Sequence, residues 1–337
     1  MNEQTLARVL IGESLLMRRV RSDIIRLASA RLSVFVQGPT GSGKELVARA
    51  LHEASGRSGA FIGINACALG DGLFEDSLFG HRRGGFTGAN ADLRGFLMEA
   101  DRGTILLDEI TGLPYALQSK LLRAIELKEF RPIGAKRDER SDFRVVSASN
   151  ENLAALVREG RFRRDLAERL CGVTIQVPAL RDRVDDIALI GAAVLRELTA
   201  RDTPVLTHGA IAALQEHDWP GNVRELRHVI ERAFAFSDRG HIDSRDVAHA
   251  LQRGQTSSSE PLTTQETRML LEALKLADYR VDVAAEILEV NRATVYRRMQ
   301  RLGVMPAAMR ANRVPHPHRA RSEGVSDDTD SPRPSLL

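Results

Sequence analysis

The feature that most restricts how this chain can fold is an apolar, β-branched run at residues 32–38 that ends in glycine-rich sequence. A helical pattern at residues 45–52 follows at once, so the order is buried strand, glycine-rich loop and helix. In such a unit the backbone N–H groups of the loop and of the first helical turn converge on one point, which suits an anion. The sequence therefore predicts a phosphate-binding loop at the end of a buried strand.

The glycine-rich loop has the spacing of a nucleotide-binding motif, in which a lysine neutralises the phosphates. Its residues are Gly38, Pro39, Thr40, Gly41, Ser42, Gly43 and Lys44. The hydroxyl residue that usually comes next and touches magnesium is replaced by Glu45, which stays within reach of the nucleotide. Asp108, at the end of another apolar strand, is therefore the expected magnesium ligand, and Glu109 is expected to orient the attacking water. The alternative is a glycine-rich turn and an acidic strand end that met by chance, which their order disfavours.

Two more apolar runs, at residues 104–107 and 143–148, alternate with amphipathic helices such as residues 116–127. This alternation is typical of a parallel α/β sheet that helices cover on both faces. Beyond residue 178 the strand signal fades and helical patterns follow, which predicts an all-helical lid. These patterns lie at residues 184–198, 209–216 and 222–236.

Composition shifts divide the chain further. We expect an α/β core at residues 1–177, the lid at 178–252, a polar linker at 253–261, a small all-α domain at 262–304 and a disordered tail at 305–337. The linker is polar and contains three successive serines, a composition that favours flexibility. The tail is rich in Pro, Arg, Ser and Asp and has almost no large apolar residue to offset the entropy of ordering.

The overall composition excludes several classes of protein. No apolar run approaches the roughly 18 to 20 residues needed to cross a bilayer, and the first residues lack the order of a signal peptide. A cytoplasmic protein with no membrane partner is expected. The two cysteines, Cys67 and Cys171, lack the spacing of a zinc site or a disulfide framework and are expected to be buried, reduced thiols. His52 and His81 also lack metal-ligand spacing.

A second loop identifies a family. Residues 84–89, Gly-Gly-Phe-Thr-Gly-Ala, resemble the Gly-Ala-Phe-Thr-Gly-Ala loop of activators of sigma-54 RNA polymerase. Three neighbouring stretches agree with that family: Leu-Phe-Gly-His at 78–81, Gly-Thr-Ile-Leu-Leu-Asp-Glu-Ile at 103–110 and Trp-Pro-Gly-Asn-Val-Arg-Glu-Leu at 219–226. The resemblance runs from about residue 11 to residue 303. It implies an AAA+ ATPase that binds ATP and magnesium, assembles as a homo-oligomeric ring, expected to be a hexamer, and acts on sigma-54 RNA polymerase.

The resemblance also implies roles for residues outside the phosphate-binding loop. Two asparagines act beside Glu109: one switches this catalytic glutamate between engaged and disengaged states, and the other senses the γ-phosphate. Three arginines complete the site: two fingers that reach a neighbouring subunit, and a second sensor in the lid. The switch is Asn65, and the γ-phosphate sensor is Asn150. The two fingers are Arg163 and Arg169, and the second sensor is Arg224. The alternative for the fingers is a solvated, arginine-rich helix end, and Arg164 is the expected bystander.

The loop departs from the family pattern at Gly85, where the family has alanine. Glycine widens the allowed backbone angles and raises the free energy of ordering by about 0.5 to 1 kcal/mol against alanine in a regular element. The residues that resemble the contacting pair, Phe86 and Thr87, remain. The loop expected to contact the sigma factor is Gly84, Gly85, Phe86, Thr87, Gly88 and Ala89. A glycine-rich turn without a partner is the alternative.

The C-terminal part has the pattern of a helix-turn-helix, with a compact helix at residues 282–288, a turn at 290–291 and a second helix at 292–302. It resembles the Fis-type domain of these activators. On the second helix Val295, Met299 and Leu302 share an inward face. The opposite face is expected to bind double-stranded DNA, although such a charged face can also be merely solvated. Its residues are Arg292, Thr294, Arg297, Arg298 and Arg301.

The motifs and the family resemblance together imply an ATP-dependent activator that binds upstream DNA and remodels the closed promoter complex of sigma-54 RNA polymerase. One rival is an ATP-gated DNA-binding regulator that acts independently of sigma-54. Another is an unrelated AAA+ remodeller such as a loader or helicase, which the Phe86 and Thr87 loop disfavours. The residues ahead of the first strand are too few for a separate sensor domain, so control is expected to come from the amount of protein or from a regulatory protein in trans.

Overall fold

The computed structural model describes residues 2–67, 71–87, 89–198, 205–237, 241–255, 273–274, 277, 281–288 and 295. The chain divides into two compact units, Met1–Ser257 and Ser258–Leu337, and each is described by itself. None of the helices in this described part has the length and apolar character needed to span a bilayer.

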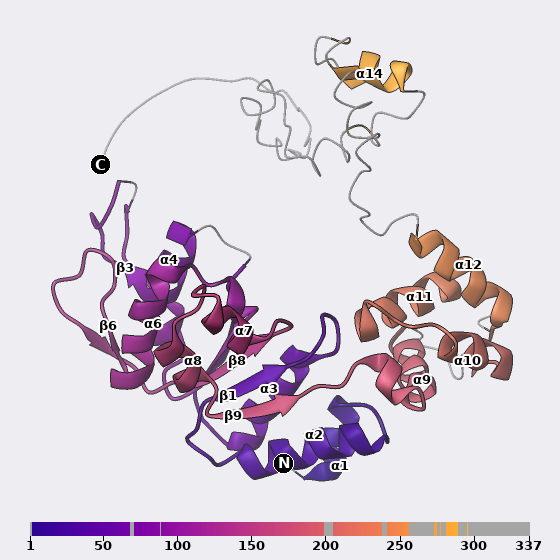
Figure 1. Ribbon diagram of the computed structural model, residues 1–337, viewed down its shortest axis with the longest axis horizontal. Helices are drawn as coiled ribbons and strands as arrows, with labels where there is room; N and C mark the ends of the chain where they lie inside the picture. The colour runs from indigo at the N-terminus through magenta and orange to yellow at the C-terminus, as the bar shows by residue number, and fades with distance from the viewer. Residues whose placement is uncertain are drawn as a thin grey trace, which may run out of the picture. The chain divides into compact units, whose positions relative to one another are not determined.

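A five-stranded parallel sheet lies at the centre of the first unit, in the order β2-β5-β8-β1-β9 (Figure 1). Its strands are β1 (Val34–Gln37), β2 (Phe61–Asn65), β5 (Thr104–Asp108), β8 (Arg144–Ser149) and β9 (Val173–Gln176). The three inner strands are almost wholly buried and confirm the apolar runs predicted at 32–38, 104–107 and 143–148. The edge strands β2 and β9 were not predicted, because Gly63 interrupts the apolar residues of β2 and the polar residues Thr174 and Gln176 alternate with those of β9.

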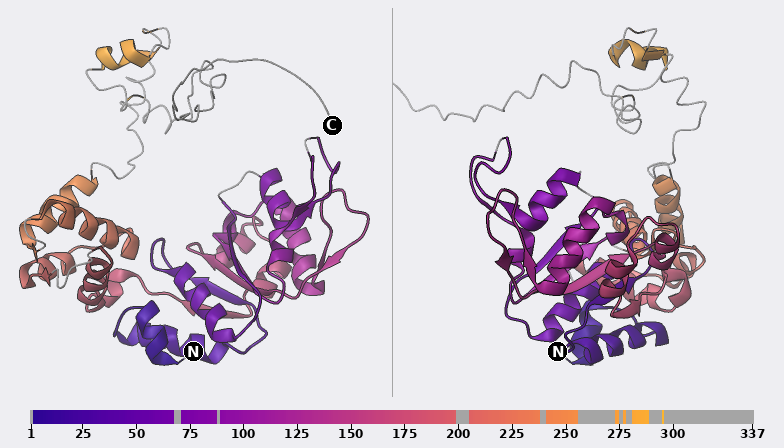
Figure 2. Two further views of the ribbon diagram at one scale, coloured as in Figure 1. Left: turned by 180° about the vertical axis from the view of Figure 1, so that it is seen from behind. Right: turned by 60° about the vertical axis from the view of Figure 1, so that its left-hand side comes forward.

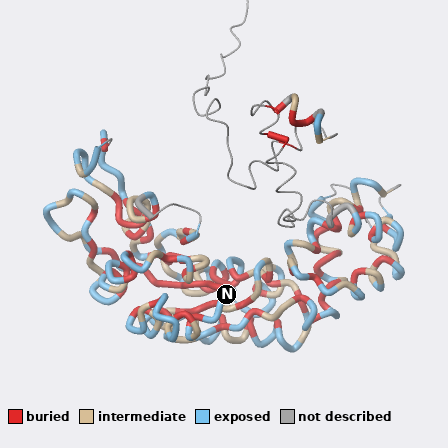
Figure 3. Tube along the Cα trace, turned by 45° about the horizontal axis from the view of Figure 1, so that its top comes forward, coloured by how far each residue is buried: buried red, intermediate tan, exposed pale blue. Residues whose placement is uncertain are grey.

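Helices cover both faces of the sheet, as the alternating pattern predicts. On one face lie α1 (Glu3–Val9), α2 (Leu15–Leu27) and α3 (Lys44–Ser55); on the other lie α4 (Asp71–Phe79), α5 (Phe96–Glu99), α6 (Tyr115–Leu127), α7 (Leu153–Arg158) and α8 (Arg164–Leu170). Successive residues of β1 point to opposite faces, so Val34 and Val36 join the first core while Phe35 joins the second. Buried segments therefore run through the middle of this layer in Figure 3.

Two short antiparallel strand pairs lie beside the α4 and α6 layer (Figure 1). They are β3 (Gly80–His81) with β4 (Leu93–Arg94), and β6 (Glu129–Phe130) with β7 (Glu139–Arg140). The loop predicted to contact the sigma factor connects β3 to β4. A bridge between His81 and Ile133 joins this loop's base to the segment between β6 and β7.

The lid follows β9 and forms a separate helical lobe (Figure 2). Its elements are the 3-10 turn η2 (Leu180–Arg183), α9 (Asp186–Leu198), α10 (His208–Gln215), α11 (Asn222–Phe236) and α12 (Ser244–Gln255), with a short parallel pair of β10 (Val205–Leu206) and β11 (His241–Ile242). The helices predicted at 184–198, 209–216 and 222–236 are confirmed. Trp219 is buried in the lid core and donates its indole N–H to Leu214 O at 2.8 Å.

Helix α12 was not anticipated, and it runs into the segment expected to be a linker at 253–261. The helix continues through Gln255, because a single glycine, here Gly254 in the last turn, costs a helix only about 1 kcal/mol. The proposed linker therefore begins no earlier than residue 256.

The second unit is described at few positions. Helix α14 (Val281–Ile287) matches the first helix of the predicted helix-turn-helix. Val295, expected on the inward face of the second helix, is buried and clusters with Leu274, Val281 and Ala284. The predicted DNA-binding residues Arg292, Thr294, Arg297, Arg298 and Arg301, and the predicted tail, lie outside the described residues.

The expectation of two buried thiols is wrong. Both cysteines are free, but Cys67 is exposed and Cys171 is partly exposed. Cys67 is exposed because it lies two residues beyond β2, where the chain leaves the edge of the sheet. Within the described ranges no cluster of three or more His, Cys, Asp or Glu side chains could hold a metal ion.

Candidate functional site

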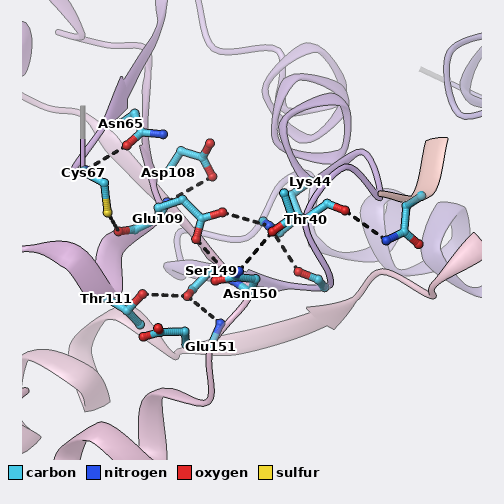
Figure 4. Close-up of polar contacts among 12 residues, drawn as sticks. Thr40, Lys44, Asn65, Cys67, Asp108, Glu109, Thr111, Ser149, Asn150 and Glu151 are labelled. Carbon is cyan, nitrogen blue, oxygen red and sulfur yellow. Dashed lines mark hydrogen bonds and ion pairs between the residues drawn. The ribbon is translucent and has the colours of Figure 1, made fainter. Parts of the chain in front are cut away.

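The predicted phosphate-binding loop connects β1 to α3 at the carboxyl end of the sheet (Figure 4). Gly41 and Gly43 adopt left-handed backbone angles, with φ of 75° and 104°. Such glycines alternate with right-handed residues to turn successive N–H groups toward one point, the arrangement that binds anions. Gly43 also precedes α3 without a side-chain cap, so the first N–H groups of the helix point into the same space.

Lys44 reaches across this loop toward the acidic end of β5. Its side chain is only 7% exposed, and its Nζ lies 3.2 Å from Gly38 O and 3.3 Å from Glu109 Oε1. The buried Oγ of Ser42 has no hydrogen-bond partner. An uncapped helix, a buried lysine and an unpartnered hydroxyl together fit the phosphates of a nucleotide.

The expected metal ligand, Asp108, and the expected catalytic glutamate, Glu109, are adjacent. Asp108 ends β5, and its Oδ1 accepts the backbone N–H of Glu109 at 3.1 Å. Burial raises the pKa of Asp108, and the neighbouring Glu109 carboxylate adds to the rise. A cation would relieve this crowding of negative charge, so the pair fits a magnesium ion held beside the phosphates. Glu45 faces away: its exposed carboxylate lies 3.4 Å from Arg49 Nη2 on the surface of α3.

The two asparagines lie on either side of Glu109 (Figure 4). Asn150 donates from its backbone N–H to Glu109 Oε2 at 3.4 Å and from its side-chain Nδ2 to Thr40 Oγ1 at 3.0 Å. Asn65 is paired with Asp108 across β2 and β5, but its Oδ1 accepts the Cys67 N–H at 2.8 Å. Glu109 is thus bound by Lys44 and Asn150, while the predicted switch residue contacts a neighbouring backbone group.

The lid reaches the loop through three hydrogen bonds, each to a backbone carbonyl oxygen of the loop. The pairs are Asn222 Nδ2 to Thr40 O at 3.0 Å, Arg224 N to Gly41 O at 3.3 Å and Arg183 Nη2 to Ser42 O at 3.1 Å. Sequence reasoning selected Arg224 but missed the other two residues. Arg183 lies in a run of charged residues that is typical of a helix surface, yet it is only 3% exposed.

The N-terminal segment is also attached to the lid. The wholly buried carboxylate of Asp186 accepts hydrogen bonds from the backbone N–H groups of Glu13 and Ser14 at 2.7 and 2.9 Å, and from Ser14 Oγ at 2.6 Å. Gly12 packs against the same carboxylate, since a Cβ there would lie 2.5 Å from it. The lid and the segment ahead of α2 therefore form one wall of the site.

A cavity of about 80 Å³ lies between the loop and this wall. Its lining is largely apolar and includes Leu10, Ile11, Leu46, Ile190 and Val223. Apolar walls next to a phosphate-binding loop suit the flat face of a nucleotide base.

The two candidate arginine fingers lie apart from the phosphate-binding loop of their own chain. Arg163 precedes α8 and forms an ion pair with Asp165 at 2.7 Å, and Arg169 is exposed in the last turn of α8. The hydrogen bonds to Asp165 raise the pKa of Arg163, which keeps it charged. Helix α8 packs on α6 and α7 rather than on α3 (Figure 1).

The predicted contact loop presents Phe86 and Thr87 to solvent, with Phe86 45% exposed. The Phe86 ring meets the ring of His81 edge-on at a centroid distance of 5.0 Å. His81 in turn lies 2.6 Å from Asp76 Oδ1 on α4. Gly88 lies outside the described residues, whereas Ala89 is buried and its N–H donates to Phe86 O at 3.1 Å.

The base of this loop packs backbone to backbone against the segment between β6 and β7. Arg82 N donates to Ile133 O at 2.9 Å, and Ile133 N donates to Gly80 O at 2.8 Å. A Cβ on Gly85 would lie 2.8 Å from Ile133 O, and a Cβ on Gly134 would lie 2.5 Å from Gly85 Cα. Contacts this short with backbone atoms admit no side chain unless one of the two segments shifts.

Comparison with known proteins assigns all three parts of the chain. The Sigma-54 interaction domain matches residues 10–176, the AAA+ ATPase lid domain matches residues 181–264 and the Fis family of bacterial regulatory proteins matches residues 261–302. The response regulator protein PilR of Pseudomonas aeruginosa is 38% identical over 88% of this chain and 70% of its own length. The chain belongs to the family of sigma-54-dependent transcriptional regulators.

Other relatives agree with this family. The transcriptional regulator VasH of Vibrio cholerae is 45% identical over 73% of this chain, which spans only 48% of VasH. The crystal structure of NtrX from Brucella abortus in complex with ADP has a TM-score of 0.66 at 30% identity and covers 90% of this chain, which spans 71% of that chain. The family excludes an unrelated loader or helicase, and the AAA+ fold with a helical lid and a Fis-type domain is confirmed.

Gly85 lies in the loop predicted to contact the sigma factor, at the position where the motif that this loop resembles has alanine. From the sequence alone, glycine at this position predicts only that the loop is more flexible. The structure adds that Gly85 lies against Ile133 and Gly134, where a methyl group would collide with backbone. Glycine at this position therefore lets the contact loop pack closely on the neighbouring segment, in addition to widening its backbone angles.

Proposed function

We propose that this chain hydrolyses ATP in a homo-oligomeric ring, expected to be a hexamer, and uses the cycle to remodel the closed promoter complex of sigma-54 RNA polymerase. Its helix-turn-helix holds the ring on upstream double-stranded DNA in the cytoplasm. The observation that supports this most is that the phosphate-binding loop, Lys44, Glu109 and Asn150 form one hydrogen-bonded group, while Phe86 and Thr87 are exposed on a separate loop. Hydrolysis and polymerase contact therefore have separate residues that one fold connects.

The residues divide the hydrolytic work among them. The loop N–H groups and Lys44 hold the phosphates, and Asp108 would hold magnesium, which supplies further neutralising charge when bound. Glu109 orients the attacking water and accepts its proton. In the structure Lys44 contacts Glu109 at 3.3 Å, so movement of Lys44 onto phosphate oxygens releases the carboxylate for this role. Asn150 donates hydrogen bonds to both Thr40 and Glu109, which supports a role in reporting a bound γ-phosphate to the catalytic glutamate.

The positions of the two candidate finger arginines are the reason to propose a ring. Arg163 and Arg169 lie on the side of the core formed by α6 to α8, away from the phosphate-binding loop of the same chain. They can act on a nucleotide only in a neighbouring subunit, where they would neutralise charge that develops on the transferred phosphoryl group. The second sensor, Arg224, lies in the lid next to Gly41.

Loss of either finger should abolish turnover in a way that a second subunit can repair. We expect Arg163→Ala and Arg169→Ala each to lower ATPase activity about 1000-fold, because a trans-acting arginine contributes about that much to phosphoryl transfer. Mixing either variant with Glu109→Gln subunits, which keep both arginines, should restore part of the activity in a coupled ATPase assay. Arg164→Ala, which removes the exposed neighbour, is the matched control and should stay near wild type. Absence of any restoration in the mixtures would argue against fingers that act in trans.

The proposal is tested by open-complex formation with purified components. Protein, ATP, enhancer DNA and sigma-54 RNA polymerase should open a supercoiled promoter, and a non-hydrolysable ATP analogue should not replace ATP. The same reaction with polymerase carrying the common sigma factor should give no ATP-dependent opening. Opening that proceeds equally with the common sigma factor would instead support an ATP-gated regulator that acts independently of sigma-54.

A further inference from the structure

Residues of the lid donate hydrogen bonds to three successive carbonyl oxygens of the phosphate-binding loop, those of residues 40–42. In a loop of this kind the carbonyl groups point outward and the N–H groups point inward, toward the anion. Three lid donors on three consecutive carbonyls therefore favour the backbone conformation that directs the N–H groups to the phosphates. The two segments also touch directly: a Cβ on Gly41 would lie 2.3 Å from Gly221 O.

Among the three donors, Asn222 is the one whose side chain is built for this contact. It is 3% exposed, its Nδ2 donates to Thr40 O at 3.0 Å and its Oδ1 accepts the Leu180 N–H at 2.8 Å. The amide has one possible orientation, because its NH2 group must face the carbonyl oxygen of Thr40 and its oxygen must face the N–H of Leu180. The amide thereby joins the loop to η2, where the chain enters the lid.

The backbone of Asn222 limits what can replace it. Its φ is 54°, in the left-handed region that asparagine, aspartate and glycine tolerate best among the amino acids. The contact of Arg224 uses its main-chain N–H, which every residue except proline provides. Arg183 brings a buried charge whose Nε has no partner, and burial lowers the pKa of its guanidinium. Asn222 is therefore the position where the contact can be removed with the least other change.

We propose that Asn222 is a positioning residue for nucleotide binding, whose amide holds the loop in its phosphate-binding conformation and couples that conformation to the lid. The inference rests on the nucleotide site proposed above. Without the Nδ2 donor, Thr40 O loses its lid partner and the loop samples other conformations. The apparent affinity for nucleotide then falls in proportion to the fraction of molecules that remain competent to bind.

Two substitutions remove either the donor group alone or both hydrogen-bonding groups of the Asn222 side chain. Asn222→Asp keeps the left-handed backbone and the acceptor for Leu180 N–H but removes the donor to Thr40 O. Asn222→Gly keeps the backbone and removes both halves without adding charge. We expect both variants to bind the fluorescent ADP analogue mant-ADP about tenfold more weakly, the loss that follows from one buried hydrogen bond and an unpaired carbonyl. Amide hydrogen exchange at residues 40–44, measured without nucleotide, should be faster in both.

Arg227→Ala is the matched control, because Arg227 lies on α11 as well but forms exposed ion pairs with Glu197 and Glu231. It should change neither mant-ADP affinity nor exchange in the loop. Thermal melting identifies any variant that fails to fold; if the buried charge of Asn222→Asp unfolds the lid, Asn222→Gly decides the question alone.

The outcomes distinguish this inference from the proposed function. Wild-type affinity and wild-type loop exchange in a folded Asn222→Gly protein would overturn the inference, and so would weaker binding with unchanged exchange at residues 40–44. In either case Lys44→Ala should still weaken binding, and the nucleotide site stands. If Lys44→Ala also binds mant-ADP like wild type, the nucleotide site itself is wrong.

Discussion

Replacing Glu109 with glutamine should stop ATP turnover while leaving nucleotide binding intact. A positioned general base contributes about 100- to 10,000-fold to rate, so kcat should fall by that factor. Binding should be unchanged or slightly tighter, because the substitution removes the 3.3 Å ion pair that holds Lys44 away from the phosphates. Glutamine is preferable to alanine at this position: Glu109 has a φ of 49°, and the longer side chain keeps the local packing of that strained turn.

Lys44→Ala is the matching substitution across the same ion pair and should give the opposite result. It removes a buried positive charge from the phosphate position, so mant-ADP binding itself should be lost. Stopped turnover with retained binding in one variant, and lost binding in the other, assigns chemistry to Glu109 and phosphate neutralisation to Lys44. ATPase activity near wild type in either variant would contradict the site assignment.

The core of the fold was predictable because its signals are local. The inner strands β1, β5 and β8 are almost wholly buried and each contains consecutive apolar residues. Helix α11 begins at Asn222 immediately after Gly221, as the periodic pattern predicts. The edge strands β2 and β9 have a weaker signal, since Gly63 breaks the short apolar run of β2 and β9 contains only two apolar residues. Helix α12 has a strongly amphipathic sequence but ends in Arg-Gly-Gln, which resembles the start of the polar segment that follows it.

The site was predictable where a motif has a chemical reason of its own. A glycine-rich loop with a lysine and an acidic strand end can be recognised by spacing, and the structure brings Lys44, Glu109 and Asn150 together. Asn222 and Asp186 could not be recognised in this way. Each acts through a hydrogen bond to backbone groups more than a hundred residues away in sequence. No local pattern carries such a contact, because only the packing of lid against core creates it.

Under the proposed function, ATP hydrolysis must move the loop that contains Phe86 and Thr87, and this motion requires contacts between the loop and the rest of the core. The loop's base is held by Ile133 through two backbone hydrogen bonds, and Gly85 allows the backbone approach beside them. Phe86 also packs on His81, which is bonded to Asp76 on α4. Motion of either the β6–β7 segment or α4 would therefore move the loop, whereas the exposed Thr87 side chain contributes nothing to these contacts.

This separation leads to the expectation that Thr87→Ala abolishes sigma-54-dependent promoter opening while ATPase activity stays within about twofold of wild type. Removal of an exposed hydroxyl should change the free energy of unfolding by less than about 0.5 kcal/mol, so the loss would reflect a missing contact with the polymerase rather than a damaged fold.

Thr87→Ser keeps the hydroxyl and should retain part of the activity. Thr5→Ala, which removes an exposed hydroxyl on α1, should retain all of it. Open-complex formation and ATPase rate are measured on the same preparations. Promoter opening at the wild-type rate by Thr87→Ala would mean that the protein does not act on sigma-54 polymerase through this residue, whatever its ATPase activity.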